Sequence, residues 1–543
     1  MSKLVRGTLI LTAATFFSKF LGLIFVIPLE RLFGTSAGAL YSYAYQPYTV
    51  ILSIATLGLP LAVSKFVSKY NALGDYATGR RLLRTGMLLM SLTGLIAFLG
   101  LFFSAEWIAG FLVKEGSKGN SISDVTMVIR LVSTALIIVP SMSLIRGYFQ
   151  GFQSMGPTAL SQVVEQIVRI GFILISATLI LKVFGGQEST AVGFATFAAF
   201  IAALASLFIL IWYWKKRKPH LDKLVKTSKR QRISLVKMYK ELIGYAIPFV
   251  AVGLAIPLYS VIDTFTINKA LMNALAYSQP EAETFYAVMT TYSQKLIMIP
   301  VSLSTGLALT VIPLITSYYT KKETHILHNQ VTKTFEIVLF LTVPAGVGLS
   351  LLAVPAYSFL FSEEVATGGY VLSWYAPTAI LFALFSVSAA ILQGINQQKF
   401  AVYSLLAGVF VKLSLNYILI ASFGIAGAII ATNFGYLISI SINLFIIKRE
   451  TDYSFKPVFK RTILIGMFIG LMTLAVVGVK SGIESMFGAN YGNSWFSGLV
   501  LIVGVIAGAG VYLYMSHFSG LLQHIFGDRL ERFLRKKRMR SNG

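Results

Sequence analysis

The chain has 543 residues, of which 56% are apolar and only 12% charged, and its formal net charge is +25. Soluble globular domains carry about 25% charged residues, so this composition excludes an ordinary soluble protein and predicts one that uses the bilayer as its solvent. The absence of cysteine excludes disulfide bonds and thiolate metal sites.

Long apolar segments alternate with short polar loops along the whole chain. Because lipid offers the backbone no hydrogen bonds, apolar segments of about 20 residues are predicted to be helices rather than strands. We therefore expect an all-α, polytopic integral membrane protein with about fourteen transmembrane helices. The segments lie at residues 8–29, 40–63, 83–104, 126–145, 158–181, 191–214, 243–266, 286–316, 335–354, 370–391, 400–421, 425–447, 462–480 and 495–515.

Positive charge is concentrated in alternate loops. About 35 of the 46 Lys and Arg residues fall in the two termini and in the even-numbered loops. Because basic loops resist translocation, both termini are predicted to lie on the cytoplasmic side of a bacterial plasma membrane. The basic runs at residues 215–218 and 535–538 fit topology signals that also contact anionic lipids, so we do not interpret them as a nucleic-acid site.

Matched motifs indicate an internal repeat. Gln150-Gly151 precedes the fifth span and Gln393-Gly394 precedes the eleventh, and a basic residue follows nineteen positions after each glutamine, at Arg169 and Lys412. Six spans per copy is an even number, so both copies would run in the same direction. Parallel repeats of this kind occur in secondary transporters.

The connection after each of these spans repeats as well. Phe184-Gly185 leads to Ala195-Thr196 in the first half, and Phe423-Gly424 leads to Ala431-Thr432 in the second. The last two spans have no counterpart in this scheme.

The repeat predicts five regions. They are an N-terminal six-helix lobe at residues 1–214, a basic cytoplasmic linker at 215–241, a C-terminal six-helix lobe at 242–449, two extra helices at 450–515, and a basic cytoplasmic tail at 516–543.

The sequence contains neither a phosphate-binding loop nor an acidic catalytic cluster, which favours a transporter without covalent chemistry over an enzyme. Ionisable residues at membrane depth are therefore the functional candidates. Lys19 lies near the middle of the first span, and Lys295 lies in the eighth. Each is either half of a structural salt bridge or a cation for an anionic substrate, and we favour the second interpretation.

Other charged candidates allow two interpretations as well. Glu165 and Arg169 stand four residues apart on the fifth span and face the same side, so we expect mutual neutralisation. Lys412 has Asn416 one turn later in place of an acid. Asp263, expected near the outer end of the seventh span, is either a coupling-ion ligand or the partner of a lysine.

Arg146 lies in the expected short inner loop between the fourth and fifth spans. It is either a contact for a phosphate at the cytoplasmic mouth of the transporter or one more topology signal.

Several motifs together resemble one family. They are Ser18-Lys19-Phe20-Leu21-Gly22, Arg31-Leu32-Phe33-Gly34, residues 146–151 with Pro157 and Glu165-Gln166, and Tyr292-Ser293-Gln294-Lys295-Leu296 with Pro300. With these, the chain resembles the MurJ/SpoVB branch of the multidrug/oligosaccharidyl-lipid/polysaccharide exporter superfamily over essentially its whole length, and in particular the Gram-positive MurJ-type lipid II flippases.

This resemblance implies two six-helix lobes around a central cavity, with two extra helices forming a groove for a lipid tail. It also implies alternating access that moves lipid II, an undecaprenyl-diphosphate-linked precursor of peptidoglycan, from the inner to the outer leaflet. Lys19 and Lys295 match basic cavity positions of the family, whereas Phe25 stands where Gram-negative relatives carry a second arginine.

The resulting hypothesis assigns two sets of residues. Lys19, Lys295 and Arg146 would bind the diphosphate, and Glu165, Arg169, Asp263 and Lys412 would act in gating or ion coupling. No metal or cofactor is expected, and the energy source would be a coupling cation or the membrane potential. Membrane lipids and the cell-wall synthesis machinery are the expected partners besides lipid II.

The alternatives are export of another lipid-linked glycan, a multidrug/cation antiporter, and a non-transporting cell-wall scaffold. Mid-span charges that are mostly basic argue against a cation antiporter, and a role in sporulation also stays open.

Overall fold

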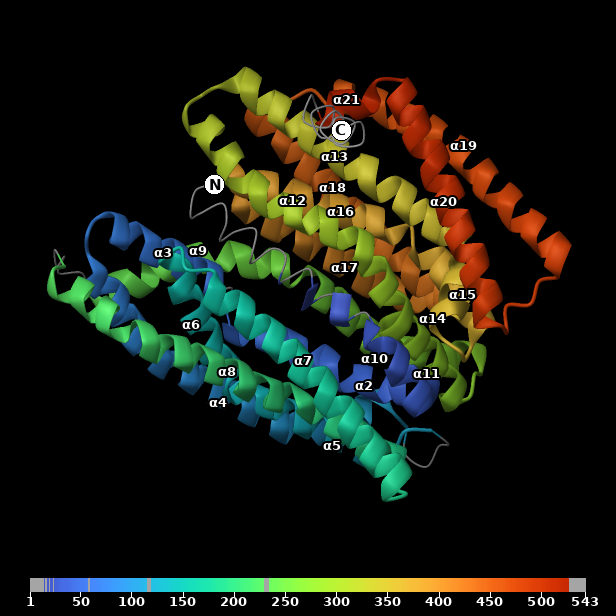
Figure 1. Cartoon of the computed structure of the whole chain (residues 1–543), viewed down its shortest axis with the longest axis horizontal. Helices are drawn as coiled ribbons and strands as arrows, with labels where there is room; N and C mark the ends of the chain where they lie inside the picture. The colour runs from blue at the N-terminus through green and yellow to red at the C-terminus, as the bar shows by residue number, and fades with distance from the viewer. Residues whose placement is uncertain are drawn as a thin grey trace, which may run out of the picture. The chain divides into compact units, whose positions relative to one another are not determined.

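The computed structural model describes residues 14, 17–18, 20–22, 24–56, 59–114, 119–228 and 234–526. Within these ranges the regular secondary structure is entirely helical, without a β-strand (Figure 1). Packing of the backbone divides the chain into two compact units. The first holds the described residues up to Thr291 together with Asn416–Ile425, and the second holds Tyr292–Leu415 and the described residues from Ala426 onward.

Among its described residues, the first unit contains thirteen helical elements, short 3-10 and π segments included. They are α2 (Val26–Thr56), α3 (Leu59–Ala72), α4 (Tyr76–Leu112), α5 (Ile122–Ser133), η1 (Thr134–Ile137), α6 (Val139–Gly151), α7 (Gly156–Thr178), η2 (Leu179–Val183), α8 (Glu188–Lys226), α9 (Leu235–Gly253), α10 (Ala255–Leu275), α11 (Gln279–Ala287) and most of η3 (Val288–Ser293).

The second unit continues from the end of η3. Its helices are α12 (Gln294–Thr320), α13 (Thr324–Leu351), α14 (Ala353–Leu360), α15 (Val365–Tyr375), α16 (Thr378–Gly394), α17 (Gln398–Phe423), α18 (Ile425–Thr451), α19 (Lys456–Phe487), α20 (Ser494–Phe518) and α21 (Leu521–Phe526). The end of α17 belongs to the first unit.

Eleven helices within the described residues are long and apolar enough to cross a membrane. The expected span at 243–266 overlaps α9 and α10, and the expected span at 286–316 overlaps the helices from α11 to α12. The expected first span lies only partly within the described residues. The predicted all-α, multi-pass membrane architecture is confirmed.

Gly34 replaces an expected loop. The spacing of apolar residues predicts a connection at residues 30–39, but the chain stays helical there and breaks only at Gly34, with φ 71° and ψ −179°. Residues with a Cβ almost never adopt this conformation, so glycine allows a sharp reversal of direction within one residue. The first two spans therefore need no loop between them.

The motif that defines the repeat also has one shape in both copies. Gly151 ends α6 and Gly394 ends α16, and two residues later Gln153 and Asn396 both have positive φ, 56° and 60°. A Cβ on Gly151 would lie 2.6 Å from Cβ of Val67 in α3, and one on Gly394 would lie 2.5 Å from Cγ2 of Ile315 in α12. Each glycine therefore permits the same close approach of two helices.

The predicted basic linker is partly helical. Helix α8 extends to Lys226, beyond the expected end of the sixth span at 214, and α9 begins at Leu235. Arg80 donates to Asp222 at 2.8 Å and stacks over the Trp214 ring at 4.3 Å, which fixes this extension of α8 against α4. The five predicted regions remain a prediction.

Candidate functional site

Lys19 lies outside the described residues. Its neighbour Gly22 is described, and a Cβ on that glycine would lie 3.2 Å from Nε2 of Gln166. This part of the first span therefore approaches α7, the helix that carries Glu165 and Arg169.

Arg146 lies on α6, close to its end, and is not in a loop. Its side chain is largely buried, with a relative exposure of 12%. Nη2 donates to Glu165 Oε2 at 2.7 Å and to Ser206 Oγ at 2.8 Å, and Nε donates to Ser161 Oγ at 3.0 Å. The guanidinium thus joins α6, α7 and α8, and this geometry favours an internal link over a contact at the cytoplasmic mouth.

Glu165 is the centre of a three-residue ionic cluster. Besides Arg146 it accepts from Arg169 Nη2 at 2.9 Å, so the predicted interaction across one helical turn is confirmed. Two guanidinium groups share one carboxylate, which leaves the cluster with one positive charge in excess. Among the described residues Nε of Arg169 is buried without a hydrogen-bond partner. The cluster therefore retains donor capacity and charge for an anion or for a coupled rearrangement.

Aromatic hydroxyl side chains of α2 lie near this cluster. The Tyr41 and Tyr45 rings stack with their centroids 4.4 Å apart, Tyr48 meets Tyr45 edge to face, and all three lie close enough to Arg169 to interact electrostatically. The sequence offered the signal Tyr41-x-Tyr43-x-Tyr45, but alternation on a helix does not reveal which tyrosines face α7.

Asp263 is buried in the middle of α10. The expected span ends at residue 266, whereas helix α10 continues to Leu275. Nδ2 of Asn416 donates to Asp263 Oδ1 at 3.2 Å and to Thr266 Oγ1 at 2.6 Å. Sequence reasoning noted Asn416 only as a missing acid, whereas the structure makes it a polar partner of α10.

Lys412 is completely buried on α17, in the second unit. Its Nζ donates to Thr432 Oγ1 at 2.5 Å, and Thr432 donates in turn to the Ala428 carbonyl at 2.8 Å. Thr432 belongs to the repeated Ala-Thr pair, so the repeat pointed to this position without revealing its role.

Lys295 lies on the first turn of α12, directly after the π-helical segment η3, and its side chain is exposed. Tyr292, three residues earlier, is buried with its ring 5.0 Å from that of Phe361. π-Helical turns are rare and frequently occur at functional sites. Lys295 thus directly follows a kind of helical turn that is frequent at functional sites.

The candidates divide between the units. Arg146, Glu165, Arg169 and Asp263 belong to the first, and Lys295 and Lys412 to the second. Within the ranges that the structure describes, no three His, Asp or Glu side chains lie close enough to hold a metal ion.

Comparison with known proteins assigns the chain to a family. Residues 4–319 match the family described as Polysaccharide biosynthesis protein, and residues 286–418 match MatE. The chain is 48% identical over 542 residues to "Lipid II flippase MurJ" of Bacillus subtilis (strain 168), with 99% of both chains covered. The chain belongs to the MurJ family. The predicted family is therefore confirmed.

Solved structures agree with this assignment at the level of the fold. A structure described as "Lipid II flippase MurJ, inward closed conformation" matches with a TM-score of 0.64 over 95% of this chain and 99% of that one, at 16% identity. An inward-facing multidrug resistance MATE transporter of the MOP superfamily matches with a TM-score of 0.64, over 80% of this chain and 94% of the other, at 15% identity. The MurJ family thus shares its helical framework with drug transporters of the MOP superfamily.

Proposed function

We propose that this protein is a lipid II flippase, which moves the diphosphate-linked peptidoglycan precursor from the inner to the outer leaflet. The observation that carries the proposal is the 48% identity to Lipid II flippase MurJ of Bacillus subtilis (strain 168), which extends over 99% of both chains. Likeness of fold alone would not separate a flippase from a drug transporter, because a MATE structure matches with the same TM-score.

The mid-span charges support an anionic substrate. A diphosphate is prohibitively costly in hydrocarbon and needs fixed cations along its path. Lys19 and Lys295 would bind it, since lysine supplies a mobile point charge that releases phosphate more readily than a bidentate arginine. An antiporter for cationic drugs would need the opposite charge at these positions.

The ionic clusters would act in gating or coupling. Glu165 with Arg169, Asp263 with Asn416, and Lys412 with Thr432 are buried polar contacts whose rearrangement could accompany alternating access. Arg146 differs from the lysines because Glu165, Ser161 and Ser206 already accept its hydrogen bonds. We assign it to the ionic cluster and not to the diphosphate. A coupling cation or the membrane potential would drive the cycle from a plasma membrane in which both termini are cytoplasmic.

Leaflet accessibility of lipid II tests the proposal. Cells that lack other flippases are depleted of this protein and complemented with wild type, Lys19→Ala, Lys295→Ala or the control Lys182→Ala, an exposed lysine outside the candidate set. We expect wild type and the control to restore outer-leaflet lipid II and both cavity variants to lower its appearance at least tenfold at matched expression.

Two results would contradict different parts of the proposal. Unchanged lipid II translocation after depletion would refute the substrate. Full complementation by both alanine variants would retain the substrate but refute the lysine mechanism.

A further inference from the structure

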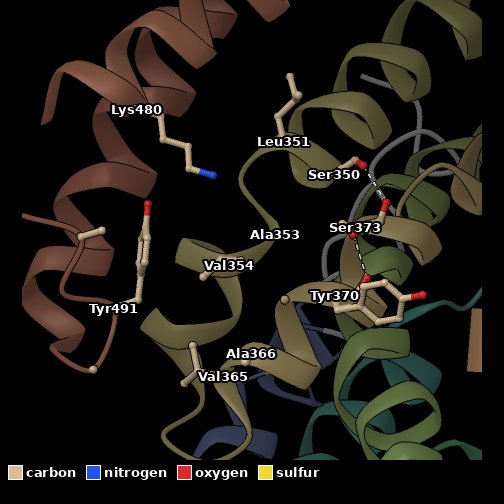
Figure 2. Close-up of a pocket in the computed structure, with 13 residues that line it drawn as sticks. Ser350, Leu351, Ala353, Val354, Val365, Ala366, Tyr370, Ser373, Lys480 and Tyr491 are labelled. Atoms are coloured by element: carbon tan, nitrogen blue, oxygen red, sulfur yellow. Dashed lines mark hydrogen bonds between the residues drawn. The ribbon is translucent and has the colours of Figure 1, made fainter. Parts of the chain in front are cut away.

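A pocket of about 710 Å³ lies within the second unit, and none of the candidate residues above lines it. It is formed where α13 ends, where α14 and α15 begin, and where the chain turns from α19 into α20 (Figure 2). Its volume is within the range of about 300–1,000 Å³ that is typical of small-molecule sites.

The residues that line the pocket include a positive charge but no negative charge. Leu351, Ala353, Val354 and Val365 contribute apolar surface, and Lys480 is the single ionisable cation, with neither Asp nor Glu among the lining residues. Figure 2 shows the Lys480 side chain reaching from α19 into the space between the helices. Within the described part of the chain it makes neither an ion pair nor a hydrogen bond. Its charge is therefore available to a ligand.

The hydroxyl groups around the pocket are largely committed to protein acceptors. Ser350 donates to the Ser373 carbonyl at 2.6 Å, Ser373 donates to the Tyr370 carbonyl at 2.7 Å, and the Tyr491 hydroxyl is hydrogen-bonded to Glu484. The serine and Tyr491 hydrogens are thus in use, and Lys480 is the strongest donor left for a ligand. The ammonium group of Lys480 would bind an anion here as a single point charge.

The side chains beside the pocket are of the kind found at the level of lipid headgroups. Met486, Phe487 and Trp495, on either side of the turn from α19 to α20, are among the most exposed apolar side chains, at 80%, 68% and 88%. Large aromatic side chains are enriched where hydrocarbon meets water and anchor helix ends there. A cation and an apolar floor at this depth match the phosphate and the adjoining glycerol and acyl carbons of a lipid better than a free phosphate ion.

We propose that this pocket binds the headgroup of a phosphate-bearing membrane lipid, with Lys480 on the phosphate and the Val354 side of the pocket against the apolar carbons. Under the predicted orientation the lipid belongs to the outer leaflet. The proposal does not rest on lipid II transport, and its failure would leave the proposed function untouched.

Glu484 allows a second test of how charge affects binding in the pocket. It stands one turn after Lys480 on α19 and is held by Tyr491. Its carboxylate opposes anion binding through its proximity alone, without lining the pocket. Replacing it should strengthen binding, whereas replacing Lys480 should weaken it.

Photolabelling tests the site. The full-length protein in phosphatidylcholine nanodiscs receives phosphatidylglycerol with a photoreactive group near its headgroup, and labelled peptides are mapped by mass spectrometry. We expect labels in segments 350–373 and 480–495, reduced at least fivefold in Lys480→Gln and increased in Glu484→Gln. Lys456→Gln, at the opposite end of the same helix, should label these segments as wild type does. Ala366→Trp, which fills the pocket from an exposed position, should reduce labelling without removing charge.

Three outcomes would overturn the proposal. Equal labelling by a matched phosphatidylcholine probe would show that charge is not recognised. Undiminished labelling of both Lys480→Gln and Ala366→Trp would remove the pocket from the contact. Displacement of the probe by millimolar inorganic phosphate would assign the site to a soluble anion instead of a lipid.

Discussion

Glu165 accepts hydrogen bonds from two arginines on two helices, so its carboxylate holds together a cluster that otherwise contains only cations. Replacing it with glutamine keeps the shape of the side chain but leaves two guanidinium groups side by side. Removal of one partner from a buried ion pair typically costs about 3–5 kcal/mol.

We therefore predict that Glu165→Gln lowers the thermal unfolding temperature of the purified protein markedly more than Glu106→Gln does. Glu106 is the matched control, because its pair with Arg130 is long, at 3.7 Å, and largely exposed. Scanning fluorimetry in detergent measures both. Equal shifts would mean that the cluster contributes no more than a surface pair.

The cluster also marks what sequence could and could not predict at this scale. Helical periodicity predicts the pairing of Glu165 with Arg169, because four residues make about one turn. Arg146 joins them through the packing of α6 against α7 and α8, which no local pattern encodes. Partners on one helix were predictable, and partners on another helix were not.

A second buried carboxylate lies in α11, before the expected eighth span. Glu283 is fully buried and accepts from the backbone N–H of Asn120 at 3.2 Å, from Nδ2 of Asn120 at 2.7 Å and from Nε2 of Gln279 at 2.9 Å. Burial outweighs these donors and raises the pKa of Glu283 to about 7. The connection from α4 to α5 is thereby fastened to α11 by a group that titrates near neutral pH.

The sign of the resulting pH dependence follows from linkage. A carboxyl whose pKa is higher in the folded protein than in the unfolded chain stabilises the fold fully below the unfolded value of about 4.3, and this contribution is lost as the pH rises through about 7. We predict that the unfolding temperature falls between pH 5 and pH 8, with a loss on the order of 3 kcal/mol. Scanning fluorimetry across this range should give a flatter profile for Glu283→Gln.

Glu281 on the same helix provides the control. Hydrogen bonds from the side chain and backbone of Ser278 lower the pKa of Glu281, so it stays ionised throughout this range. Glu281→Gln should shift the unfolding temperature by the same amount at every pH between 5 and 8, so that the slope of unfolding temperature against pH stays unchanged. A slope that is retained in Glu283→Gln would assign the dependence to another group.

At the scale of helices, the two repeat glycines set how closely α6 approaches α3 and α16 approaches α12. Alanine at Gly151 or Gly394 would place a methyl group within 2.6 Å of Val67 or 2.5 Å of Ile315. Overpacking of this kind typically costs about 1–3 kcal/mol. We predict that each substitution lowers the unfolding temperature and the yield of folded protein. Gly171→Ala on α7, where nothing lies within 4 Å, should be neutral or slightly stabilising. Tolerance of both repeat substitutions would mean that the helices separate without cost.

Apolar patterns in the sequence do not predict where the helices begin and end. Apolar runs locate helices well, but they do not reveal that α8 continues to Lys226 beyond its apolar part, because contacts such as that of Arg80 with Asp222 sustain a polar helix. Nor do they predict that Gly34 alone replaces a loop, since the conformation of one residue has no periodicity. The spacing of the repeat motifs predicted equivalent turns correctly, because Gly151 and Gly394 occupy the same position in their two copies.

At the scale of the whole chain, the distribution of charge predicts one orientation. With both termini cytoplasmic, the turn at residues 488–493 between α19 and α20 would face outward. We predict that a cytoplasm-active fluorescent reporter works at either terminus. An export-dependent phosphatase should be active when inserted after Gly492 and inactive at the C-terminus. Phosphatase activity at the C-terminus would invert the topology and move the pocket near Lys480 to the inner leaflet.

The position of η3 in the chain has a mechanical consequence. The chain passes from the first unit to the second between Thr291 and Tyr292, inside this π-helical segment. Thr291 is anchored to the first unit, where its hydroxyl donates to the Gly38 carbonyl at 2.8 Å, whereas Tyr292 packs on Phe361 in the second. A π turn contains one surplus residue, and each residue that this surplus passes when it shifts along a helix turns by about 100°. A shift of the surplus from η3 past Lys295 would therefore move the lysine from one face of α12 to another while the helix remains continuous.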